Sequence, residues 1–140
     1  MQLALYKGKG LIGNALIRWW TKSIYSHCEL VINGICYSSS AMDGGVRYKE
    51  IDLTNGKWDL IDLPWANEEM ALTFFENTKG SKYDWWGLLG SQIINFRGNI
   101  KDSYFCNEWV CSALGIPLAE IYNPDTFGQL CKFLTEFKST

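Results

Sequence analysis

The stretch from His27 to Ser40 reads HCELVINGICYSSS and decides the fold. Asn33-Gly34, at its centre, is typical of a two-residue type I′ hairpin turn, because both positions need positive φ. The sequence therefore predicts two antiparallel strands, His27–Ile32 and Ile35–Ser40. The turn fixes their register and pairs Ile32 with Ile35, Val31 with Cys36, Glu29 with Ser38 and His27 with Ser40.

The two faces of this hairpin differ, because side chains alternate along a strand and directly paired residues share a face. The expected core face holds Cys28, Leu30, Ile32, Ile35, Tyr37 and Ser39. The other face holds His27, Glu29, Val31, Cys36, Ser38 and Ser40. The second face is unusually polar, which indicates that it meets something other than hydrophobic core.

The flanking segments predict a single α+β domain over residues 1–140. Turn signals separate further strands at Leu3–Tyr6, Val46–Leu53 and Lys57–Asp62. We expect the four strands between His27 and Asp62 to form one antiparallel sheet. Apolar residues at helical spacing and capping signals predict helices at 11–20, Asn67–Lys79, Tyr83–Phe96, Ser103–Leu114 and Pro124–Phe133. Helices that follow such a sheet favour an α+β architecture.

Composition excludes several classes of function. A net charge of −2 and a pI of 5.4 argue against a nucleic-acid footprint. No apolar run reaches the roughly 18 residues of a membrane span, and residues 1–10 lack the features of a signal peptide. Five cysteines without a CxxC spacing, beside one histidine, favour reduced thiols rather than disulfides or a zinc site. We therefore expect a cytoplasmic protein without metal or cofactor.

Among the five cysteines, Cys106 has the placement of a nucleophile. Ser103 or a near neighbour is expected to cap the helix, which puts Cys106 in its first turn. The partial positive charge and free N–H groups at a helix N-terminus lower a thiol pKa and can bind an oxyanion. The other cysteines lie deeper in that helix (Cys111), in an amphipathic helix (Cys131), on the core face (Cys28) or far from a helix terminus (Cys36).

His27 is the only histidine, so any imidazole chemistry must use it. Glu29 lies two residues away on the same face, where its carboxylate can orient the imidazole and stabilise the charged form. Solvation of Glu29, or pairing with a lysine or arginine, is the alternative. We also expect the helix of Cys106 to pack on the face that carries His27.

The segment from Gly8 to Gly13 matches the dinucleotide-binding pattern G-x-G-x-x-G. That pattern requires an acidic residue at the end of a second parallel strand. Glu29 instead lies near the start of a strand that runs into a hairpin, and no βαβ unit follows. Nucleotide binding is therefore not favoured.

Four short motifs resemble one known family: Ser26-His27-Cys28-Glu29-Leu30, Asp43-Gly44-Gly45-Val46, Tyr83-Asp84-Trp85 and Phe105-Cys106-Asn107-Glu108-Trp109-Val110. They look like the circularly permuted NlpC-type papain-like hydrolases, the YiiX-like proteins related to lecithin–retinol acyltransferase, with small forms in phages and bacteria. The likeness spans about residues 23 to 115. Its most specific feature is the order of a histidine on an early strand and a cysteine at a later helix start.

The resemblance implies a permuted papain-like fold, in which an antiparallel half-barrel sheet packs against helices. It also implies that Cys106 is the nucleophile and His27 the general base. Family members often take a third polar residue from the neighbouring strand, where this chain offers Ser38, Ser39 or Ser40. The register argument favours Glu29, leaves Ser38 or Ser40 as alternatives, and turns Ser39 toward the core.

The expected function is a cysteine hydrolase or acyl-transfer enzyme that works through a thioester. The resemblance suggests a substrate amide in a cell-wall peptide or an acyl group on a lipid. Two alternatives keep the same fold without catalysis: a binding module, and a structural phage or interaction protein. The sequence leaves the oligomeric state open.

Overall fold

The computed structural model describes residues 1–8, 23–83, 103–104, 106–117 and 122–138. The helix expected at 11–20, nearly all of the helix expected at Tyr83–Phe96, and most of the G-x-G-x-x-G segment lie outside these residues.

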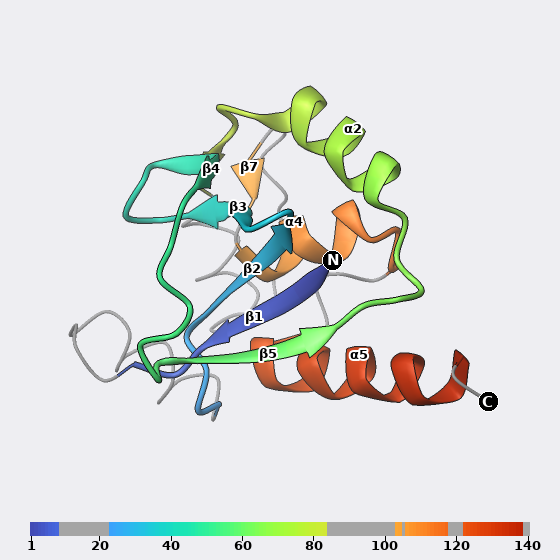
Figure 1. Ribbon diagram of the computed structural model, residues 1–140. Helices are drawn as coiled ribbons and strands as arrows, with labels where there is room; N and C mark the ends of the chain where they lie inside the picture. The colour runs from blue at the N-terminus through green and yellow to red at the C-terminus, as the bar shows by residue number, and fades with distance from the viewer. Residues whose placement is uncertain (9–22, 84–102, 105, 118–121, 139–140) are drawn as a thin grey trace, which may run out of the picture.

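Seven strands form one sheet in the order β5-β1-β2-β3-β4-β6-β7 (Figure 1). Their bounds are Gln2–Tyr6 (β1), His27–Ile32 (β2), Ile35–Ser40 (β3), Gly45–Lys49 (β4), Trp58–Asp62 (β5), Lys82–Tyr83 (β6) and Ser103–Tyr104 (β7). The five longer strands, β1 to β5, pair antiparallel with their neighbours. The two-residue strands β6 and β7 extend the β4 edge, and they pair with each other in parallel. Together with the helices, this sheet gives the expected α+β fold.

The position of β5 differs from a simple meander of four strands. We expected Lys57–Asp62 to follow Val46–Leu53 in the sheet, but β4 ends at Lys49 and β5 pairs with β1 at the opposite side. Leu3, Ala4 and Leu5 of β1 are almost completely buried. A strand covered on both faces belongs inside a sheet, so β1 lies between β2 and β5 and the 50–57 loop crosses to the far side.

The β2–β3 hairpin begins as the sequence predicts and then opens. Asn33 and Gly34 have φ of 50° and 81°, as a type I′ turn requires. Three residue pairs follow, ending with Leu30 and Tyr37. The expected pairs of Glu29 with Ser38 and of His27 with Ser40 do not form: beyond Tyr37, Ser38–Ser40 of β3 pair only with β4 among the described strands.

The opening between β2 and β3 is stabilised by a side chain. The Ser38 hydroxyl donates a hydrogen bond of 2.7 Å to the carbonyl of Cys28, which the partner strand leaves free. Figure 1 shows the two strands diverging from their common turn. The start of β2, which carries His27, therefore lies next to a gap in the ladder.

Three described helices cover the sheet: α2 (Glu68–Thr78), α4 (Cys106–Ala113) and α5 (Pro124–Lys138). The side chain of Asn67 caps α2 by accepting a bond of 3.0 Å from the Met70 N–H. Helix α5 continues five residues beyond the predicted end at Phe133 and packs on β1 and β5. Gly128 permits this approach, because a Cβ there would lie 2.6 Å from Leu5 Cδ1. No helix in the described part of the chain is long and apolar enough to cross a membrane.

The main core lies between the sheet and these helices. Cys28, Leu30 and Ile32 of β2 contribute to it, together with Trp109 and Val110 of α4. A smaller cluster on the other face joins three buried residues, Ala4, Val31 and Cys36, to the partly buried Ile51, Leu53 and Trp58. The two faces of β2 thus alternate as the sequence predicts, and the 50–57 loop covers the second.

Candidate active site

Cys106 is the first residue of α4 and is 6% exposed. The helix begins later than predicted: Ser103 belongs to β7 and does not cap it, and the residue before Cys106 lies outside the described part. The first N–H groups of a helix have no intrahelical partner and carry partial positive charge. Cys106 therefore occupies the end of α4 where a thiolate is most stable.

Helix α4 packs on the face of the sheet that carries Cys28 and Leu30, so the expectation that it would cover the His27 face is wrong. The reason is that Trp109, Val110 and the rest of the apolar side of α4 need the apolar face of β2. His27 and Cys106 nevertheless lie close enough to shift each other's pKa. The gap between β2 and β3 explains how residues from the two sides meet.

The His27 imidazole also binds Glu29. Its Nε2 lies 2.7 Å from Glu29 Oε1. Burial alone would lower the pKa of His27, but the negative charges of Glu29 and Cys106 and hydrogen bonds with both raise it to about 10. The geometry therefore favours an imidazolium at neutral pH.

Glu29 is completely buried and pairs with an arginine as well as with His27. Arg47 donates two hydrogen bonds to the carboxylate, 2.7 Å from Nη1 to Oε2 and 2.6 Å from Nη2 to Oε1. Burial would raise the pKa of Glu29, but the charge of His27 and the contacts with Arg47 lower it overall. Both outcomes weighed from the sequence, an imidazole contact and an arginine pair, occur together.

Arg47 was not identified from the sequence. Its Nε donates a further bond of 2.8 Å to Asp43, so Arg47 links Asp43 to Glu29. The pairing of Ser38 with Arg47 puts this side chain on the face of Glu29. The register of β3 and β4 would have revealed Arg47, but the glycine turn before β4 left that register undetermined.

Cys28 lies in the main core, as the sequence predicts, and it also borders the candidate site, which the sequence analysis did not anticipate. Its thiol is fully buried, lies 3.9 Å from Asn107 Oδ1 and hydrogen-bonds with Cys106. This bond to Cys28 is the largest influence that lowers the pKa of Cys106 well below its usual range. The charge of His27, its hydrogen bond and the backbone N–H of Cys28 act in the same direction and outweigh burial.

The remaining cysteines have the opposite character. Burial raises the pKa of Cys36 to about 11 and of Cys131 to about 12, and it also raises the pKa of Cys111. All three stay protonated at neutral pH. Cys106 is thus set apart chemically from every cysteine that the sequence ranked below it.

The serines considered as orienting residues have other partners. Ser38 binds the Cys28 carbonyl, and Ser40 helps to lower the pKa of Asp43. Ser39 is buried toward the core side, in agreement with its predicted face. The described contact to the imidazole comes from Glu29, whose catalytic role stays a prediction.

Substitution of Cys28 by alanine should raise the apparent pKa of Cys106, because it removes the donor that most favours the thiolate. The pH dependence of Cys106 alkylation by iodoacetamide, followed by peptide mass spectrometry, measures this shift. Cys131→Ala is the matched control and should leave the profile in place. A profile that does not move in Cys28→Ala would show that the Cys28 thiol has no part in the site.

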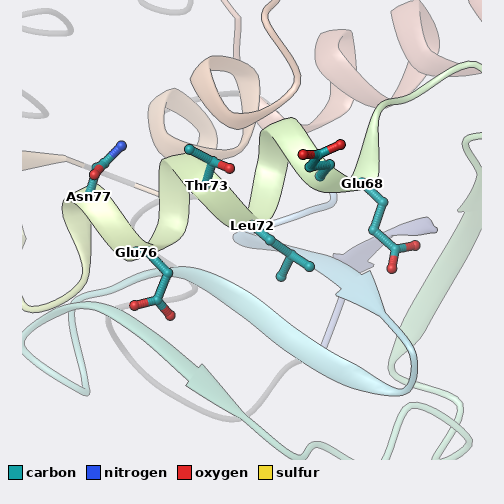
Figure 2. A pocket seen from close by; sticks show the side chains of 6 residues that line it. Glu68, Leu72, Thr73, Glu76 and Asn77 are labelled. Carbon is teal, nitrogen blue, oxygen red and sulfur yellow. The ribbon is translucent and has the colours of Figure 1, made fainter.

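The hollows that border the described residues include one along α2 and one beside His27. One, of about 590 Å³, runs along α2, and Figure 2 shows that helix residues such as Glu68, Leu72 and Glu76 line it. It lies on the outer side of one helix and contains none of the residues discussed above. The other, of about 580 Å³, is lined by His27, Glu29 and Arg47 and borders the candidate site.

Comparison of the chain with protein-family models and with curated proteins finds no match. Within the described part of the chain, no cluster of three or more histidine, cysteine or acidic side chains could hold a metal ion. The chemistry of the site must therefore be argued from its own geometry.

Proposed function

We propose that the protein is a cysteine hydrolase or acyl-transfer enzyme in which Cys106 is the nucleophile and His27 the general base. One observation carries this proposal: Cys106 and His27 shift each other's pKa in opposite directions, so that their charged forms are favoured together. A thiolate beside an imidazolium is the activated form of a cysteine nucleophile. Structural cysteines, such as Cys131 here, show the reverse shift.

The reaction would proceed in two steps. The Cys106 thiolate attacks the carbonyl carbon of an amide or ester, and the first N–H groups of α4 stabilise the oxyanion. His27 gives its proton to the departing amine or alcohol, which leaves a thioester on Cys106. A water molecule, deprotonated by His27, then attacks the thioester and releases the acyl group as an acid. This step restores the Cys106 thiolate and the His27 imidazolium.

Glu29 and Arg47 would hold the imidazole in place during this cycle. A carboxylate on Nε2 fixes the tautomer and turns Nδ1 toward the thiol. Because Arg47 balances Glu29, the carboxylate stays ionised although it is buried. We include Glu29 in the proposed catalytic set as the residue that orients His27.

The permuted papain-like family remains our interpretation of the chain. What supports it is the order of the pair, with His27 at the start of a strand and Cys106 at the start of a later helix. Under this proposal the substrate is a peptide amide or an acyl lipid. A binding module of the same fold would not need an activated thiol, so reactivity separates the two functions.

At pH 6, Cys106 should react with iodoacetamide faster than the other four cysteines. The expected difference from Cys131 is at least about 100-fold, because burial keeps the latter protonated. Brief labelling followed by peptide mass spectrometry gives the occupancy of each site. Equal labelling of Cys106 and Cys131 in native protein would remove the case for an activated nucleophile. Labelling in urea, where all five should react alike, is the control.

A further inference from the structure

The pocket beside His27 lies on the sheet face away from α4. Tyr6 pairs with both His27 and Trp58 across the sheet, so these three side chains share a face. The pocket is lined there by Tyr6, Ser26, His27, Glu29, Arg47 and Trp58. Cys106 is not among its described lining residues, so the pocket borders the imidazole rather than the sulfur.

Ser26 provides an unused polar group in this pocket. Its side chain is 4% exposed, and its hydroxyl has no hydrogen-bond partner among the described residues. The backbone N–H of Ser26 donates 2.9 Å to the carbonyl of Tyr6, which fixes the residue next to His27. Buried hydroxyls are normally hydrogen-bonded, so a ligand atom at this position would complete the site.

Two acidic residues at the pocket have no basic partner among the described ion pairs. Seven residues with acidic or basic side chains line it, and the described ion pairs use five of them: His27, Glu29, Asp43, Arg47 and Lys49. Glu50 and Asp52 take part in no ion pair within the described ranges, and both are exposed where the pocket meets solvent. Asp52 Oδ1 accepts hydrogen bonds from the backbone N–H and the hydroxyl of Thr54, so its charge is still unpaired within the described part of the chain. Two carboxylates at the mouth favour a positively charged group.

An aromatic wall connects the imidazole to this mouth. The rings of Tyr6 and Trp58 lie 4.9 Å apart, and Trp58 meets the His27 ring edge-on at 6.5 Å. Trp58 is only partly buried, which leaves aromatic surface for a ligand. Such a surface packs against an apolar chain and also attracts cations.

We propose that this pocket binds the leaving group of the substrate, and that this group is an amine or alcohol whose apolar body ends in a cation. The inference rests on the proposed function, because a leaving group protonated by His27 must depart on the imidazole side. Ser26 then hydrogen-bonds to the polar atoms next to the scissile bond. The apolar body lies on Trp58, and the cation lies between Glu50 and Asp52.

Three probes of matched shape test the proposal on Cys106→Ala protein, which binds without turnover. They are N-acetylcadaverine, which ends in a cation, N-pentylacetamide, which is neutral, and N-acetyl-6-aminohexanoate, which ends in an anion. Calorimetric titration at pH 7 should show the cation binding at least about tenfold more tightly than the anion. The variant Glu50→Gln/Asp52→Asn should reduce this preference to about twofold.

Ser26→Ala should lower the affinity for all three probes by about fivefold, which corresponds to the loss of one hydrogen bond. Its thermal midpoint should not fall, because the removed hydroxyl has no described partner. Phe133→Ala, on the exposed surface of α5, is the control and should bind as the parent does. Cys106→Ser replaces Cys106→Ala if the latter does not fold.

Equal affinity for the three probes, or unchanged binding in Ser26→Ala, would overturn the proposal. The binding of the probes is measured without the Cys106 thiol, so it does not depend on whether Cys106 is a nucleophile. A cation preference in a protein whose Cys106 reacts like an ordinary thiol would keep the pocket and reject the proposed function. An activated Cys106 without any cation preference would keep the function and reject the pocket.

Discussion

Substitution of His27 by alanine should lower the acylation rate of Cys106 by at least about 100-fold, within the range expected for loss of a general base. The burst of p-nitrophenolate from p-nitrophenyl acetate at pH 6 measures this step. Two effects combine: the thiolate loses the adjacent positive charge, and no base remains to take the thiol proton. The reactive phenolate leaving group needs little protonation, so amides should show a larger loss.

His27→Gln is the companion variant, because glutamine keeps a polar side chain of similar reach but carries no charge. It should behave like His27→Ala, while circular dichroism shows both variants folded. A burst within threefold of wild type in either folded variant would contradict the assignment of His27 as the base.

The second large effect concerns stability. Arg47→Met should lower the free energy of unfolding by about 3–5 kcal/mol, because it removes both arginine hydrogen bonds from the buried Glu29 carboxylate and leaves His27 as its described charged partner. Urea denaturation at pH 7 measures the change. Lys49→Met is the matched control: Lys49 is exposed, and its contact with Asp43 is 3.2 Å, so its loss should change stability by less than about 1 kcal/mol.

The pH dependence of this loss has a defined sign. The folded pKa of Glu29 lies below its usual value of 4.5, so the stabilisation from its ionised form is present above pH 4.5 and is lost as pH falls through the folded pKa. The difference between wild type and Arg47→Met should therefore shrink in acid. Equal losses for Arg47→Met and Lys49→Met at pH 7 would show that Glu29 does not depend on Arg47.

Local signals in the sequence were sufficient for much of the fold. Asn33-Gly34 determined the bounds of β2 and β3, and Asn67 with Gly80 marked the ends of α2. These features depend on backbone preferences of a few neighbouring residues. The expectation that Lys57–Asp62 would follow Val46–Leu53 in the sheet was wrong, because the place of β5 depends on which strand must be buried on both faces, and packing across the whole sheet determines that.

The candidate site also combines residues that local sequence signals predicted with residues that depend on packing. The faces of β2 predicted the contact between His27 and Glu29, and the helix start singled out Cys106. Cys28 was missed because its contact with Asn107 depends on how α4 packs on β2. Arg47 was missed because the turn before β4 left the register of β3 and β4 undetermined, and the alternation of side chains within one hairpin does not reveal that register.

The most direct test of the Cys106–His27 pair is the titration of the histidine ring by NMR. His27 is the only histidine, so selective ¹⁵N labelling of histidine gives signals from this ring alone. The account predicts an imidazolium throughout pH 6–8, with a titration midpoint near pH 10. The midpoint should fall in Cys106→Ala, because one of the two negative partners is removed. A ring that titrates near 6.5 in the wild type, and does not respond to Cys106→Ala, would contradict the thiolate–imidazolium pair.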